Sequence, residues 1–185
     1  MMPQYRFLDP ISAIARPIDP RLPSNIFAVV WSAGLALATV LYGGAQGQAI
    51  ETSALHAVWL AFGALLAWII TRELDPDYPA SAMLAAVLTP ALMVGFEAEP
   101  HLIALFLLVT LTRVVNRSTG RPILWTDFIG ILILVGLTAT TEAWPLAFFG
   151  VLAFWMDGRL KAPHPRWAIF AGLSFGVAAL GLAYQ

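Results

Sequence analysis

The amino-acid sequence predicts an all-α integral membrane protein, a bundle of about seven transmembrane helices. Three observations lead to this prediction. Of the 185 residues, 59% are hydrophobic and only 11% are charged, whereas a soluble domain carries roughly 25% charged residues. Seven apolar runs follow one another along the chain, and Lys and Arg fall only before the first run and at or after the ends of the second, fourth and sixth runs. A water-soluble fold could not cover its surface with so little charge.

Residues 1–23 form the first element, a proline-rich segment that precedes the apolar runs. It contains five prolines and five charged residues. Proline lacks a backbone N–H and interrupts a helix, so no long regular helix is expected here. Apolar residues are interleaved with the charges, which fits a segment lying on the cytoplasmic membrane surface. A disordered cytoplasmic tail is the equally open alternative.

The seven apolar runs are expected to be helices of one transmembrane domain over residues 24–185. The first and last are long enough to span, but several middle runs fall below the ~20 residues that a hydrocarbon core requires. Either the bilayer thins locally around them, or some pairs dip in and return. A pair of runs that entered and left the membrane on the same side would place Glu97 and Glu99, or Glu142, inside the hydrocarbon. Burying these charges is costly, which favours full crossing. The runs are residues 24–42, 54–70, 80–96, 102–115, 123–139, 143–156 and 167–184.

Charge placement predicts the orientation of these crossings. All ten Lys and Arg residues lie in the N-terminal segment or at or after the ends of the second, fourth and sixth runs. Cytoplasmic loops carry an excess of Lys and Arg, so the N-terminus is expected in the cytoplasm and the C-terminus outside. The expected location is a cell membrane, specifically a prokaryotic cytoplasmic membrane. The net charge of −1 predicts no nucleic-acid partner.

An internal repeat is indicated by three prolines at intervals of 43 residues, Pro79, Pro122 and Pro165. Each closes a loop just before the next apolar run. Shifting the sequence by 86 residues aligns Leu-Ala-Phe at 60–62 with Leu-Ala-Phe at 146–148. This spacing predicts three repeated helical hairpins plus one C-terminal helix, a parallel repeat because each copy enters from the same side.

The end of the second run carries the densest group of acids, Glu73, Asp75 and Asp77. Carboxylates close together at a membrane surface can hold Mg²⁺ and through it a diphosphate. The alternative is a solvated turn that leaves the membrane, where Asp and Pro are favoured for local reasons. The turn is the simpler interpretation.

Basic and amide side chains near the predicted cytoplasmic ends are candidates for binding anions or lipid headgroups, because guanidinium groups suit phosphate oxygens. They could equally enforce topology alone. Asp127 is the only acid inside an apolar run and should face the bundle and pair with Arg113, Arg117 or Arg72. A structural role is favoured for it over a catalytic one. The anion-binding candidates are Arg72, Arg113, Asn116, Arg117 and Arg121.

The function expected first is that of a non-catalytic scaffold or accessory subunit in a membrane assembly. Its partners would be membrane lipid and either another membrane protein or a second copy of the chain. A membrane-embedded enzyme acting on a phosphate-bearing lipid is the alternative, with the catalytic candidates Glu73, Asp75, Asp77 and Asp127, and a transporter is the second alternative. No metal site and no cofactor are expected, except Mg²⁺ under the enzyme alternative. The chain has no cysteine, which excludes thiolate ligands and disulfides.

Overall fold

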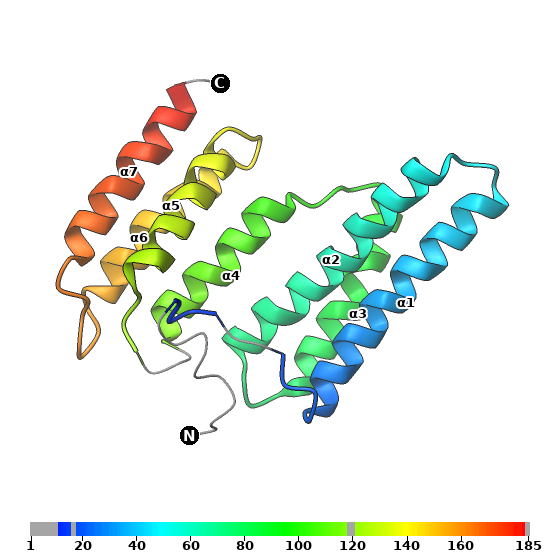
Figure 1. Ribbon diagram of the computed structural model, residues 1–185, viewed down its shortest axis with the longest axis horizontal. Coiled ribbons are helices and arrows are strands. Elements are labelled where there is room, and N and C mark those ends of the chain that lie inside the picture. The colour runs from blue at the N-terminus through cyan, green and yellow to red at the C-terminus, as the bar shows by residue number, and fades with distance from the viewer. Residues whose placement is uncertain (1–10, 16–17, 118–120, 184–185) are drawn as a thin grey trace. The chain divides into compact units, whose positions relative to one another are not determined.

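The computed structural model describes residues 11–15, 18–117 and 121–183. Within these residues the chain forms seven α-helices and no β-strand (Figure 1), so the all-α prediction is confirmed. Residues 1–10 and 16–17 of the predicted N-terminal segment, and residue 184 of the last predicted run, lie outside the described residues. The helices are α1 (Pro23–Ala45), α2 (Ile50–Leu74), α3 (Pro79–Gly95), α4 (Leu102–Asn116), α5 (Trp125–Ala139), α6 (Phe149–Asp157) and α7 (Trp167–Ala183).

The boundaries of α3, α4 and α7 follow the proline and loop signals closely, whereas α2 extends four residues beyond each end of the run expected at 54–70. Pro79 is the first residue of α3, where its missing N–H would have no partner in any case. The sixth run differs from the expectation, because it begins as the 3-10 helix η2 (Trp144–Phe148) and becomes α-helical only in α6. A 3-10 turn rises farther per residue than an α-helix, so η2 lengthens this short element.

The chain divides into two compact units, which are described separately here. Unit 1 comprises residues 1–17 and 106–185, and unit 2 comprises residues 18–105. Unit 2 therefore holds α1 to α3, and unit 1 holds α5, η2, α6, α7 and most of α4. A single transmembrane domain and the hairpin repeat stay predictions.

Small residues bring the helices of unit 2 together. Ala28, Ala82 and Ala86 are buried with Trp68 in one cluster, and short side chains allow helix backbones to approach closely. The indole Nε1 of Trp31 donates a hydrogen bond to the Ala86 carbonyl oxygen at 2.9 Å. α1 and α2 are antiparallel neighbours joined by residues 46–49.

An aromatic cluster forms the core at one end of unit 1. Phe128 of α5 stacks on Phe170 of α7 with ring centroids 3.9 Å apart. Phe154 of α6 meets both rings edge-on at 5.6 Å. Toward the other end, Gly181 of α7 packs directly against Ala139 of α5. The start of α5 and the end of α6 are thereby held side by side.

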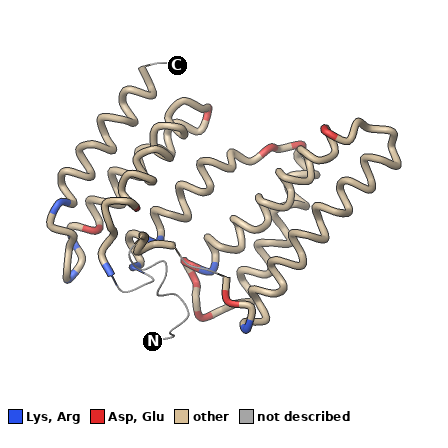
Figure 2. The backbone as a smooth tube through the Cα atoms, viewed as in Figure 1, with Lys and Arg blue, Asp and Glu red and all other residues tan. Residues whose placement is uncertain are grey.

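Two helices, α1 with 23 residues and α2 with 25, are long and apolar enough to cross a membrane by length and composition. The remaining apolar helices are shorter. Charged residues lie at the helix ends and in the loops, and within each unit the Lys and Arg residues gather at one end (Figure 2).

Candidate functional site

Two buried carboxylates lie at the basic end of unit 1. Asp127 is in the first turn of α5 and is 6% exposed, and Asp157 is the last residue of α6 and is 1% exposed. A buried carboxylate is costly unless it is paired or hydrogen-bonded. The hydrogen-bond and ion-pair partners of these two carboxylates therefore decide whether their role is structural or chemical.

Asp127 is surrounded by hydrogen-bond donors. One carboxylate oxygen accepts a hydrogen bond from the Ser12 hydroxyl. The other accepts the backbone N–H of Ala13 at 2.8 Å and that of Leu124 at 2.9 Å. The bond to Leu124 caps the N-terminus of α5, where a negative charge also favours the helix dipole. Asp127 thus joins the N-terminal segment to α5.

Residues 11–15 are held to unit 1 by further contacts. The Thr126 hydroxyl donates to the Ile11 carbonyl oxygen, and Arg113 Nη1 donates to the Ile14 carbonyl oxygen at 3.2 Å. Ser12 also accepts the backbone N–H of Ala15 at 2.8 Å, which closes a tight turn. Ile14 packs against the hydrophobic core. This part of the predicted interfacial segment is therefore docked on the protein itself.

Asp157 holds two distant segments together. Arg117 Nη2 lies 2.7 Å from its Oδ1, and the backbone N–H of His164 donates to its Oδ2 at 3.0 Å. Arg117 directly follows α4 and has a φ of 46°, a left-handed conformation that commonly ends helices. This conformation turns the chain where the Arg117 side chain reaches α6. Arg117, an expected partner of Asp127, pairs with Asp157 instead.

His164 is fixed in the loop between α6 and α7. Its ring stacks on Phe170 with centroids 4.8 Å apart, and its Nδ1 accepts the N–H of Arg166 at 3.1 Å. Burial lowers the pKa of His164 below its usual value of 6.5; Asp157 opposes this shift, and Arg166 and Arg117 add to it. The neutral ring is therefore favoured in the folded state.

The acidic group predicted at the end of the second run belongs to unit 2. Asp75 directly follows α2, and its Oδ2 accepts a hydrogen bond from the Ser81 hydroxyl at 3.1 Å. Arg72 Nη1 donates to the Pro76 carbonyl oxygen at 2.7 Å. Asp77 is exposed, and Glu73 lies in the last turn of α2. These local bonds are those of a turn that ends a helix.

The remaining candidates are Asn116, the last residue of α4, and Arg121, which is exposed. In the described ranges no three Asp, Glu or His side chains come together as a metal ion would require. Catalysis and anion binding by the sequence-predicted residues stay predictions.

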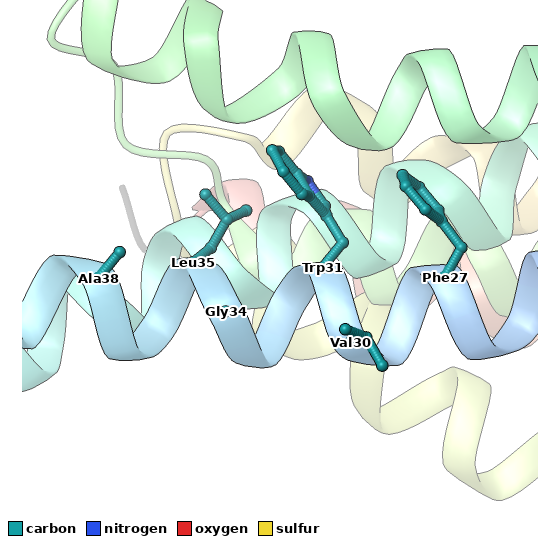
Figure 3. Close-up of a pocket in the computed structure, with 6 residues that line it drawn as sticks. All are labelled: Phe27, Val30, Trp31, Gly34, Leu35 and Ala38. Carbon is teal, nitrogen blue, oxygen red and sulfur yellow. The ribbon is translucent and has the colours of Figure 1, made fainter.

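A shallow groove of about 360 Å³ runs along α1 (Figure 3). Phe27, Trp31 and Leu35 project from one side of the helix and Val30 from the other, and Gly34 and Ala38 complete the lining. The Trp31 N–H, the polar group of this lining, is already bonded to Ala86. The lining of the groove can therefore make apolar contacts, but it presents no free polar group for binding or catalysis.

Sequence reasoning missed Ser12, Asp157 and His164 as parts of this end of unit 1. Asp157 could have been found, because an acid directly after an apolar run is under the same pressure to pair as Asp127. Ser12 had no signal, since its role depends on where the N-terminal segment folds back. A comparison of the chain with protein-family models, curated proteins and solved structures found no match.

Proposed function

We propose that the chain is a multi-pass membrane protein whose seven helices all cross the bilayer, and that it serves as a non-catalytic scaffold or accessory subunit. The N-terminus would lie in the cytoplasm and the C-terminus on the opposite side, in a prokaryotic cytoplasmic membrane. The observation that carries this proposal is the outward display of large apolar side chains on all seven helices. Leu41 of α1, for example, is 63% exposed.

Lipid is the environment that fits such a surface. Exposed apolar patches larger than a few hundred Å² are rare on soluble monomers. Here every helix presents large apolar side chains outward, and the helix interiors carry no Lys or Arg. The few charges that are buried are paired or hydrogen-bonded, as hydrocarbon would demand.

Charge asymmetry supports the orientation. In unit 2, Arg21 precedes α1 and Arg72 lies in the last turn of α2, whereas Glu51 and Glu97 lie at the opposite end. In unit 1, the described Lys and Arg residues all lie at the end that holds Asp127, and Glu142 lies at the other (Figure 2). The positive-inside rule assigns each basic end to the cytoplasm.

The short helices are compatible with crossing. A 15-residue helix is only about 22 Å long, less than the ~30 Å of a typical hydrocarbon core. Local thinning of the bilayer makes up such a difference at a modest cost.

A scaffold role is better supported than catalysis. Both oxygens of Asp127 are occupied by donors from the chain itself, and both oxygens of Asp157 are likewise bonded. By contrast, Gly172 and Gly176 lie one turn apart on the exposed side of α7, with nothing within 4 Å of a Cβ added at either. Two small residues with this spacing allow another helix to approach closely.

Topology can be tested by single-cysteine labelling, because the natural sequence contains no cysteine. A cysteine at Gln46, Glu97 or Glu142 should react from outside intact cells with a membrane-impermeant maleimide. A cysteine at Asp77, Arg121 or Lys161 should react only after the membrane is opened. Labelling of the Lys161 position from outside would refute the proposed threading.

The scaffold role can be tested by purification in mild detergent. A membrane-protein partner in fixed stoichiometry, or a stable homo-oligomer, is the expected result. A Gly172→Leu variant should lose that partner, whereas Gly34→Leu, at an equally open position on α1, should retain it. A monodisperse monomer that binds nothing would contradict the role.

A further inference from the structure

We infer that residues 158–166, here named the basic loop, form a binding site for the headgroups of anionic phospholipids. The inference rests on the proposed membrane location. The loop connects α6 to α7 and carries three exposed cations, Arg159, Lys161 and Arg166. It contains none of the anion-binding candidates predicted from the sequence.

Among the described residues, no carboxylate compensates the charges of the basic loop. Across the described part of the chain, no carboxylate lies within ion-pair distance of Arg159, Lys161 or Arg166. The nearest acid in sequence, Asp157, is already paired with Arg117 and bonded to the His164 N–H. The three cations therefore keep their attraction for an external anion.

Two of the three cations are held over tryptophan rings. The guanidinium carbon of Arg159 lies 4.7 Å from the ring centroid of Trp155, and that of Arg166 lies 4.9 Å from Trp125. A guanidinium stacked on an aromatic face still presents its N–H edge, which suits phosphate oxygens. The two indoles are 45% and 47% exposed, and half-exposed tryptophans settle at the depth of lipid headgroups.

The loop is pre-formed. Asp157 accepts the His164 N–H, and the His164 ring is stacked on Phe170. Gly158 lies so close to the Trp167 indole that an added Cβ would come within 2.7 Å of its Cε2 atom. A loop already held in one conformation loses less entropy when it binds.

A lipid fits this site better than a free anion does. Beside the tryptophans, α5 exposes Ile129 and α6 exposes Leu152, and α7, which follows the loop, exposes Ile169. Cations at the helix ends and apolar side chains beyond them match the order of a headgroup and its acyl chains. A free phosphate would use only the cations.

The inference can be tested with purified protein in detergent micelles. Phosphatidylglycerol should raise the thermal midpoint more than phosphatidylcholine does, with a measurable apparent Kd. Arg159→Gln and Arg166→Gln should each raise that Kd about five-fold, because each removes one cation from the site and a cation near anionic headgroups contributes about 1 kcal/mol of binding free energy. Arg21→Gln, which removes an exposed cation from unit 2, is the matched control and should change little.

Three outcomes would overturn the inference. The two lipids could stabilise the protein equally, Arg21→Gln could weaken binding as much as Arg166→Gln does, or inorganic phosphate could reproduce the whole effect. Extraction of membranes with alkaline carbonate separates these outcomes from failure of the membrane location. A protein that resists carbonate but shows no lipid preference refutes only the lipid site, and one that carbonate removes refutes the location.

Discussion

Arg117 and Asp157, 40 residues apart in the sequence, form an ion pair of 2.7 Å with the arginine side chain 15% exposed and the aspartate side chain 1% exposed. The pair joins the residue after α4 to the last residue of α6. Because Asp157 also accepts the His164 N–H, one carboxylate fixes both the end of α4 and the loop before α7.

Replacing Asp157 with Ala should destabilise the protein strongly. The change leaves the partly buried Arg117 without its counter-charge. Breaking a fully buried pair costs about 3 to 5 kcal/mol, and the 15% exposure of the arginine side chain places the expected loss at the lower end of that range. Thermal unfolding in detergent measures the loss. Asp77→Ala, at an exposed position, should have almost no effect; equal midpoints for the two variants would contradict a stabilising role for the pair.

Asp127→Asn should loosen the N-terminal segment without disrupting the helices. One amide oxygen cannot replace both carboxylate oxygens that accept from Ser12 and from the N–H groups of Ala13 and Leu124. Hydrogen bonds to a charged group contribute about 1.5 to 3 kcal/mol. Hydrogen exchange should speed up at the Ala13 amide in the variant, while amides at the middle of α5 stay protected. Unchanged protection at Ala13 would show that Asp127 does not hold the segment.

Stability should fall as the pH drops below about 6.5. Burial lowers the pKa of His164 from its ordinary 6.5, so the unfolded chain takes up a proton more readily than the folded one as the pH falls through this value. This contribution is complete above pH 6.5 and is lost progressively below it. The thermal midpoint should therefore decrease in this range for the natural chain and decrease less for His164→Gln. His56→Gln, which removes an exposed histidine of unit 2, should keep the natural profile; an unaltered profile for His164→Gln would refute the assignment.

Substitution of leucine for two glycines of α7 should affect stability at one position and not at the other. A Cβ at Gly181 would overlap Ala139, whereas one at Gly172 meets nothing within 4 Å. Gly181→Leu should therefore lower stability by at least about 1 to 3 kcal/mol, the usual cost of overpacking. Gly172→Leu should leave the thermal midpoint unchanged and act only on association, measured by light scattering with correction for detergent. A loss of stability in Gly172→Leu alone would mean that this side of α7 packs within the chain.

The helices were predictable from the sequence because each one is a predominantly apolar run bounded by charge, proline or glycine. The run expected at 102–115 is observed as Leu102–Asn116, and the one expected at 80–96 as Pro79–Gly95. The change to a 3-10 turn at Trp144–Phe148 was not predictable, because 3-10 and α-helices share the same apolar composition.

The partners of the charged groups could be predicted only in part. The pressure on Asp127 to find a partner was visible in the sequence, since an acid within an apolar run cannot face lipid. The identity of that partner was not, because Ser12 lies 115 residues away and reaches Asp127 only through the docking of residues 11–15.

The sequence by itself determined the all-helical class, the number of helices over the described residues and the concentration of Lys and Arg between alternate apolar runs, because hydropathy and charge are local properties of the chain. Only the tertiary structure decided that Arg117 binds Asp157, that Asp127 binds the N-terminal segment, and that Arg159 and Arg166 lie over tryptophans. These contacts depend on which helix ends meet in space. That in turn depends on packing between side chains far apart in sequence, such as Phe128 with Phe170.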